Sequence, residues 1–260
     1  MGWKDHAIDF STNSFIIAPM PKLTVIPVPI GNIDDITIRA KEELLNAQVI
    51  LCEDTRVTNK LLRKLNIDVS GKKLFPYFEH NERQKLSKVL ELLEQNIDVV
   101  LVSDAGMPLI SDPGFPLIRK LRDLQYAGNK SIQVDILPGP SSVINALVSS
   151  GLPTDKFTFL GYFPRKSGDR RKLFQNIRKA NIHLKSTYIA FESPVRLNAS
   201  LESMQKYLGN DISITLHWEM TKKFERINVG KLGQIVSQIK QNEINLKGEL
   251  VVVFHLDDKL

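Results

Sequence analysis

The segment VVLVSDAGMPLISDPGFPLIRKLRDL, residues 99–124, carries the clearest structural signal in this chain. Residues 99–103 have the length and the β-branched, apolar composition of a buried strand. A loop with two glycines and two prolines follows, and a helical pattern begins near residue 116. A strand, a glycine- and proline-rich loop and a helix in this order predict one unit of an α/β fold.

The same alternation continues from residue 23 to the end of the chain. In the first half it predicts strands at residues 23–28, 49–53, 74–78, 99–103 and 132–137, and helices at 37–46, 58–65, 81–95 and 116–124. A helix ending near residue 149 leads to a second set. There we expect strands near 157–161, 187–192, 212–218 and 249–254, and helices near 170–180, 194–207 and 232–241. The pattern is typical of an α/β fold with largely parallel strands.

The length of the chain suits two domains. It has 260 residues, of which 42% are hydrophobic and 25% charged, and domains usually run to about 100–200 residues. The boundary is expected within residues 137–153. We therefore expect an N-terminal extension at residues 1–22, an N-terminal α/β domain at 23–138 and a C-terminal α/β domain at 139–260.

Several classes of protein are disfavoured by composition. Cys52 is the single cysteine, so the chain forms no intrachain disulfide, and its apolar neighbours predict a small buried residue on a strand. The five histidines lack the spacing of a zinc site. Apolar runs such as residues 250–254 are far shorter than the about 20 residues of a membrane helix. Residues 1–22 resemble neither a secretory signal nor a transit peptide.

Three loops share one character: PVPIGN at residues 27–32, DAGMP at 104–108 and PGPSS at 138–142. Each follows an expected strand and precedes a helix, which is where ligands bind in open α/β sheets. In any one of these loops, the glycine and proline residues could simply form a turn. Three such loops at equivalent strand ends predict a ligand site. None has the glycine spacing of a dinucleotide or phosphate loop, so the ligand should carry little phosphate there.

Positive charge is concentrated in one segment. The formal net charge is +6 and the isoelectric point is near 9.3. The predicted RNA-contact residues are Arg165, Lys166, Arg170, Arg171 and Lys172, and Arg178 and Lys179 continue the run. A solvated helix face is the alternative, but such clustering favours contact with RNA phosphates.

Motifs along most of the chain resemble a known family. In the first half these are PVPIGNIDDIT (27–37), CEDTR (52–56), EHNE (79–82), SDAGMPLISDPG (103–114) and LPGPS (137–141). In the second half they are GLPTD (151–155), FPRK (163–166), ESPVR (192–196), EMTK (219–222) and KGEL (247–250). Together they resemble the small-subunit rRNA methyltransferase I family of the tetrapyrrole methylase-like superfamily, over about residues 23–256.

The resemblance implies a class III methyltransferase with two α/β domains and a cofactor cleft between them. It implies a homodimer in the cytoplasm that uses S-adenosylmethionine to methylate the ribose 2′-hydroxyl of cytidine 1402 in 16S rRNA, naked or in the small ribosomal subunit. It also implies that the cofactor is held mainly by backbone groups. The residues concerned are Pro29, Ile30, Gly31, Asp104, Ala105, Gly106, Met107, Pro108, Ile110, Ser111, Ser141 and Ser142.

Carboxylates supply the candidate catalytic groups. Asp104 could face the positive charge of the cofactor, or it could only shape its own loop. A ribose hydroxyl is a poor acid, so a general base would help. The candidates, all expected at strand ends, are Glu79, His80, Glu82 and Glu192. Asp112 is expected to cap the helix that follows it.

Two other functions remain open at this level. A small-molecule tetrapyrrole methylase of the precorrin type would share the scaffold but would leave the basic segment unexplained. A non-catalytic RNA-binding assembly factor would have no use for the cofactor loops.

Overall fold

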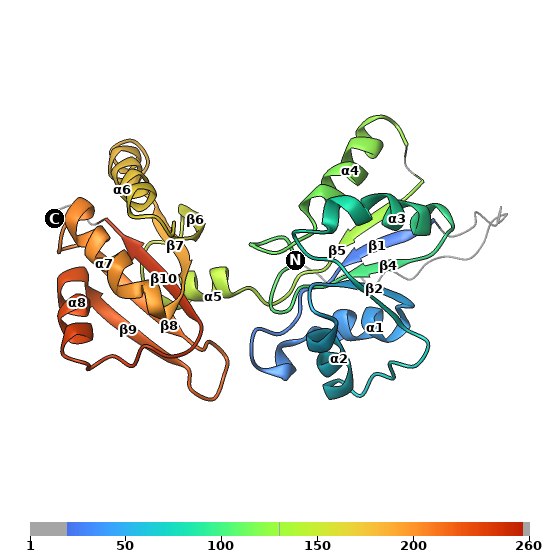
Figure 1. The fold of residues 1–260 in the computed structure, drawn as a ribbon, viewed down its shortest axis with the longest axis horizontal. Helices are drawn as coiled ribbons and strands as arrows, with labels where there is room; N and C mark the ends of the chain where they lie inside the picture. The colour runs from blue at the N-terminus through green and yellow to red at the C-terminus, as the bar shows by residue number, and fades with distance from the viewer. Residues whose placement is uncertain (1–19, 130, 257–260) are drawn as a thin grey trace, which may run out of the picture.

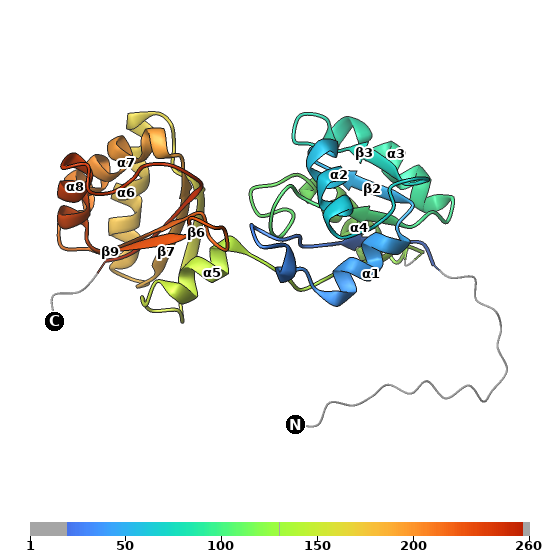
Figure 2. The ribbon, with the colours of Figure 1, turned by 90° about the horizontal axis from the view of Figure 1, so that it is seen from below.

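Two five-stranded sheets form the protein. The structure, a computed structural model, describes residues 20–129 and 131–256, so most of the expected extension at residues 1–22 lies outside the described residues. Figures 1 and 2 show the sheets as separate bodies, which we call the N-terminal and C-terminal halves, joined by the segment between β5 and α5. The α/β class is confirmed.

The N-terminal sheet is entirely parallel, with the strand order β3-β2-β4-β1-β5. Its strands are β1 (Lys22–Val25), β2 (Val49–Cys52), β3 (Lys73–Pro76), β4 (Val99–Leu101) and β5 (Gln133–Ile136). Its helices are α1 (Ile38–Asn46), α2 (Thr55–Lys64), α3 (Glu82–Glu94) and α4 (Phe115–Tyr126), with a short 3-10 helix at Ile33–Asp35.

Apolar side chains on both faces explain this layering. Val49 and Leu51 of β2 pack with α3 and α4, whereas Ile50 and Cys52 pack with α1 and α2. A parallel sheet needs cover on both faces, and so its central strands read as continuous apolar runs. The prediction that Cys52 is a buried strand residue is confirmed.

The C-terminal sheet has the order β6-β7-β10-β8-β9. Its strands are β6 (Phe157–Tyr162), β7 (Thr187–Glu192), β8 (Ser213–Trp218), β9 (Arg226–Lys231) and β10 (Leu250–His255). Helices α6 (Ser167–Asn181), α7 (Pro194–Leu208) and α8 (Leu232–Lys240) cover one face, and α5 (Ser142–Ser149) packs on the other.

The expectation of largely parallel strands is wrong for this second sheet. Only β6 and β7 pair in parallel, and the other three pairs are antiparallel. Apolar runs mark where strands lie but carry no information on their direction. Strand β9 was not predicted, because RINVGK is an edge strand with alternating polar residues and no continuous apolar run.

Capping explains a shifted helix boundary. Helix α2 begins three residues before its predicted start, because the Asp54 carboxylate accepts a hydrogen bond from the Arg56 amide over 2.8 Å.

Within residues 20–129 and 131–256, no helix has the length and apolar character needed to cross a membrane. The same residues contain no His, Cys, Asp or Glu group arranged to hold a metal ion.

Candidate functional site

The three glycine- and proline-rich loops meet at one edge of the N-terminal sheet. They follow β1, β4 and β5, which are neighbours in the strand order. Val28 and Gly106 exchange backbone hydrogen bonds of 3.0 and 2.9 Å, which join the first two loops. Gly106 has φ +76°, and a Cβ there would lie 3.2 Å from Cγ2 of Ile30 and 3.7 Å from the carbonyl oxygen of Pro140. All three loops therefore close around this glycine.

Side-chain contacts hold the middle loop in shape. The Ser103 hydroxyl lies 3.2 Å from the carbonyl oxygens of both Ala105 and Gly106. One carboxylate oxygen of Asp104 accepts a hydrogen bond of 3.1 Å from the Asp54 amide. Leu109 and Ser111 both have positive φ. A backbone fixed in this way presents its amides and carbonyls in set directions, which suits binding by backbone groups.

A cavity of about 400 Å³ opens over these loops, within the usual size range of ligand pockets. Residues of both halves line it. The N-terminal half contributes Ile30, Asp104, Ala105, Gly106, Met107, Ile110 and Asp112, and the joining segment contributes Ser141. The remaining lining comes from Ser142, Val143, Tyr162, Phe191, Glu192, Ser193, Pro194, His217, Met220 and residues 248–251.

Eight of the twelve predicted cofactor residues line this cavity. The four that do not are Pro29, Gly31, Pro108 and Ser111, each next to or two residues from a lining residue. Gly31 instead faces the C-terminal half, where a Cβ would lie 2.6 Å from the Thr221 hydroxyl oxygen. The structure thus brings the predicted loops together.

Asp104 lines the cavity and is half-buried. Burial raises the pKa of its carboxyl group, and the nearby Asp54 acts in the same direction, while the hydrogen bond from the Asp54 amide opposes them. The loop-shaping role considered for Asp104 is present in that hydrogen bond. Its carboxylate also remains exposed to the cavity, so both roles are compatible.

Two of the four candidate bases, Glu192 and Glu79, have different surroundings. Glu192 lines the cavity, but it is buried and its oxygens are engaged by Arg196 at 2.7 Å, the Ser193 amide at 2.7 Å and the Ser200 hydroxyl. Glu79 is exposed and is not among the residues that line the cavity.

Asp112 differs most from expectation, because it caps no helix. Gly114 is the N-cap residue of α4, and its amide donates to Glu82 over 2.8 Å. Glu82, the first residue of α3, therefore connects α3 to the start of α4. Asp112 instead lines the cavity, where burial, reinforced by Glu53, raises the pKa of its carboxyl group to about 7. In the sequence, the only indication that Asp112 lies in the cavity was its place in the same loop as Asp104.

His217 is a further cavity residue that the sequence did not single out. It is buried in β8, with Nε2 2.8 Å from the Thr215 hydroxyl and Nδ1 3.3 Å from the Ser149 hydroxyl. Burial lowers its pKa to about 4, so the imidazole is neutral near pH 7. Both ring nitrogens of His217 therefore have hydroxyl groups beside them.

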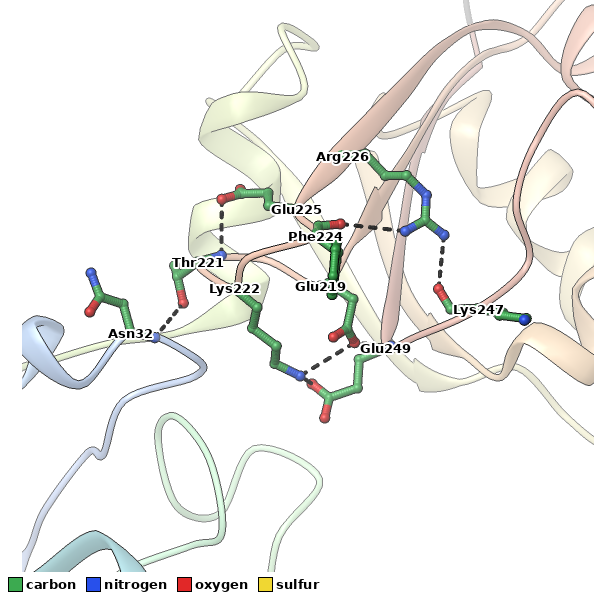
Figure 3. Close-up of polar contacts among 9 residues, drawn as sticks. All are labelled: Asn32, Glu219, Thr221, Lys222, Phe224, Glu225, Arg226, Lys247 and Glu249. Atoms are coloured by element: carbon green, nitrogen blue, oxygen red, sulfur yellow. Dashed lines mark hydrogen bonds and ion pairs between the residues drawn. The ribbon is translucent and has the colours of Figure 1, made fainter. Parts of the chain in front are cut away.

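The turn after β8 joins the two halves (Figure 3). The amide of Asn32 donates to the Thr221 hydroxyl over 3.0 Å. Within the turn, Nζ of Lys222 lies 3.4 Å from a Glu219 oxygen and 2.9 Å from a Glu249 oxygen. The Glu249 amide also donates to Glu219. This network fixes the turn that carries Met220 into the cavity. Glu219, Thr221 and Lys222 belong to the EMTK motif, and Glu249 belongs to the KGEL motif. The sequence had predicted no role for either motif.

The basic segment is only partly available to a partner. Arg165, Lys166, Arg171 and Lys172 are exposed at the start of α6. Arg170 is buried, and its guanidinium donates to the carbonyl oxygens of Pro164 and Arg165 over 3.1 and 2.7 Å. This side chain therefore holds the turn before α6, and contact of Arg170 with RNA stays a prediction.

Known proteins resemble this chain in sequence and in fold. The family of Tetrapyrrole (Corrin/Porphyrin) Methylases matches residues 22–236. The Ribosomal RNA small subunit methyltransferase I of Vibrio cholerae is 41% identical over 235 residues, which are 90% of this chain and 77% of that protein.

Among solved structures, the methyltransferase CobJ superposes with a TM-score of 0.64 and 17% identity, covering 91% of this chain and 94% of CobJ. A uroporphyrin-III C-methyltransferase from Thermus thermophilus, in complex with S-adenosylhomocysteine, has a TM-score of 0.54 and 16% identity. The superposition covers 90% of this chain and 97% of the uroporphyrin-III C-methyltransferase. At such identities the structures show a shared fold.

Proposed function

Because this chain belongs to the small-subunit rRNA methyltransferase I family of tetrapyrrole methylases, we propose that it methylates 16S rRNA from S-adenosylmethionine. The acceptor is the ribose 2′-hydroxyl of the cytidine at position 1402, in the decoding region, and the reaction takes place in the cytoplasm. The observation that carries the proposal is the cavity that three backbone loops and the C-terminal half build together.

The cavity suits S-adenosylmethionine in its chemistry. Ala105, Gly106 and Met107 line the cavity, where their backbone amides and carbonyls can bind polar groups. Ile30 and Val143 offer apolar surface to a ring. The carboxylates of the cavity favour a cationic ligand over a phosphorylated one. When bound, S-adenosylmethionine supplies an electrophilic methyl group on a sulfonium.

Asp112 is our candidate for the general base. It lines the same cavity as the cofactor loop, and a pKa of about 7 lets its carboxylate accept a proton from the ribose hydroxyl near neutral pH. The oxygens of Glu192 already accept from Arg196, Ser193 and Ser200, so Glu192 acts by positioning its neighbours. A role for exposed Glu79 stays a prediction.

RNA phosphates are bound by the exposed part of the basic segment. Arg165, Lys166, Arg171 and Lys172 begin three residues after Tyr162, which lines the cavity. The segment therefore begins close in sequence to the cavity, and positive charge that contacts RNA phosphates increases affinity and its dependence on salt.

A homodimer is part of the same proposal. Ile227 and Val229 of β9 are 41% and 69% exposed. Ile227 pairs with His217, which contacts Ser149 of α5, so the two apolar side chains lie on the α5 side of the sheet. Val148 of α5 is 68% exposed on that side. We propose that a second copy covers this face.

Sedimentation tests the proposed homodimer. The wild type should sediment as a dimer and Val229→Glu as a monomer. A monomeric wild type would refute the homodimer proposal.

Mass spectrometry of the decoding-region cytidine tests the function. Ribosomes from cells lacking the protein should miss one ribose methyl group, and purified protein with S-adenosylmethionine should restore it. Calorimetry should show that the protein binds S-adenosylmethionine. Methylation of a corrinoid but not of rRNA would identify a tetrapyrrole methylase. A protein that binds RNA but no cofactor would be an assembly factor.

A further inference from the structure

Helix α2 presents four positive charges on one exposed face. Arg56, Lys60, Arg63 and Lys64 are separated by four, three and one positions, which brings them to the same side of a helix with 3.6 residues per turn. All four are exposed, while Leu62 on the opposite side is buried in the N-terminal core. None of them belongs to the basic segment at α6.

These side chains line a groove between α2 and the edge of the sheet. Thr55 and Asn59 of α2 and Leu74 of β3 complete it, and we call it the α2 groove. No carboxylate lines it, and Leu74 is its single apolar contributor. A groove of this composition fits an anionic ligand rather than an apolar one.

The charges of the groove are largely unneutralised. Arg56 forms an ion pair with Asp54. In the part of the chain that the structure describes, Lys60, Arg63 and Lys64 form none. Like charges three and four residues apart reduce the stability of a helix. The helix dipole offsets part of this repulsion, since Arg63 and Lys64 lie in the last turn of α2, and an anionic ligand would offset the rest.

The α2 groove begins beside the cavity. Asp54, the residue before α2, donates its amide to Asp104, which lines the cavity. The groove then runs away from that point, with about 12 Å of helix between Arg56 and Lys64 at 1.5 Å per residue. A ligand in the groove therefore passes close to a group in the cavity.

We propose that the α2 groove binds the phosphate backbone of the RNA strand next to the acceptor nucleotide. The inference rests on the proposed function, because it takes RNA as the substrate. Lysine and arginine contacts to phosphates position a nucleic acid without reading its sequence. No aromatic side chain lines the groove, so base stacking does not contribute there. The cations of α6 belong to the other half, so the strand is held by both halves around the cavity.

The test is a double variant of the full chain, Lys60→Gln with Arg63→Gln. Glutamine keeps the helix propensity of α2 while removing two charges. We expect roughly tenfold weaker binding of a synthetic decoding-region RNA, and a slope of log affinity against log salt that falls by about 1.4. The KM for RNA should rise with kcat unchanged. Calorimetry should give an unchanged affinity for S-adenosylmethionine.

A matched control removes the same charge elsewhere in the N-terminal half. Lys41→Gln with Lys120→Gln alters two exposed lysines outside the groove. It should leave RNA affinity within about twofold of the wild type, since lysines that contact no phosphate release no counterions on binding. Equal losses in the two double variants would overturn the proposal, as would an unchanged RNA affinity in the groove variant.

Three further outcomes separate the possible errors. If the groove variant binds small ribosomal subunits less tightly but binds naked RNA normally, the groove contacts a ribosomal protein and the inference is wrong. If the wild-type protein methylates no rRNA at all, the proposed function fails. If the wild type methylates rRNA and the groove variant does so with the same KM, only the α2 groove assignment fails.

Discussion

The backbone amide of Asn32 donates a hydrogen bond of 3.0 Å to the hydroxyl of Thr221, 189 positions later in the chain. Asn32 ends the first of the three glycine- and proline-rich loops, and Thr221 lies in the turn that brings Met220 into the cavity. This single contact therefore ties together the two halves between which the cavity forms. Gly31 packs against the same turn, with space for no side chain.

Gly31→Ala should disturb that contact and weaken cofactor binding. A Cβ at Gly31 would lie 2.5 Å from Cγ of Lys222 and 2.9 Å from the carbonyl oxygen of Met220, so the turn must move. We expect the Kd for S-adenosylmethionine to rise roughly tenfold, which corresponds to about 1.4 kcal/mol. Gly168→Ala is the control, because nothing lies within 4 Å of a Cβ there. Equal affinities in both variants and the wild type would contradict this role.

Asp112→Asn should remove the pH dependence of methyl transfer. With a pKa of about 7, Asp112 becomes ionised as the pH rises through neutrality, so the wild-type rate should increase to a plateau above that pH. The variant should be roughly a hundredfold slower and insensitive to pH in this range. Single-turnover rates with saturating cofactor measure both. A variant with the wild-type profile would exclude Asp112 as the base.

The same substitution should stabilise the protein at high pH. A carboxyl group whose pKa is raised by folding favours the native state below its unfolded pKa, and this contribution is lost as the pH rises through the folded value. Asparagine removes the ionised, desolvated group. Thermal unfolding should therefore show a Tm for Asp112→Asn a few degrees above wild type at about pH 8, and no gain at about pH 4. A lower Tm at both pH values would indicate a structural carboxylate.

His217 should make the fold sensitive to acid. Its pKa falls to about 4 on folding, from 6.5, so its contribution to stability is present above 6.5 and is lost as the pH falls toward 4. The loss should approach about 3 kcal/mol, from 1.36 kcal/mol per pKa unit. Denaturant titrations at about pH 7.5 and pH 5 should show a smaller pH effect for His217→Gln. His183→Gln, at an exposed site, should behave as wild type.

Arg196→Ala should destabilise the C-terminal half. Glu192 is 3% exposed, and Arg196 is its ion-pair partner at 2.7 Å. Removing the arginine leaves a buried carboxylate without its counter-charge, which typically costs about 3 kcal/mol or more. Arg119→Ala breaks an exposed pair with Asp123 and should cost less than about 0.5 kcal/mol. Urea unfolding compares the two, and equal effects would show that burial of Glu192 matters little.

Local sequence predicted the units of this fold well. Strand β7 was expected at its observed bounds, because Thr187–Glu192 is apolar and is followed by Ser193 and Pro194, which begin a helix. Strand β9 was missed, since an edge strand with one exposed face has no continuous apolar run. Its pairing with β8 depends on residues distant in sequence.

The sequence alone determined the strand–loop–helix units and the three glycine- and proline-rich loops at strand ends, because side-chain periodicity, capping and glycine conformation act between near neighbours. Tertiary structure alone decided the direction of the C-terminal strands, the inward turn of Arg170 and the place of Asp112 in the cavity. The burial of a side chain and the charges near it depend on the residues that pack against it, and these can be distant in sequence. The pKa of Asp112 depends on Glu53 and on a cavity wall from the other half, and neither can be read from its own loop.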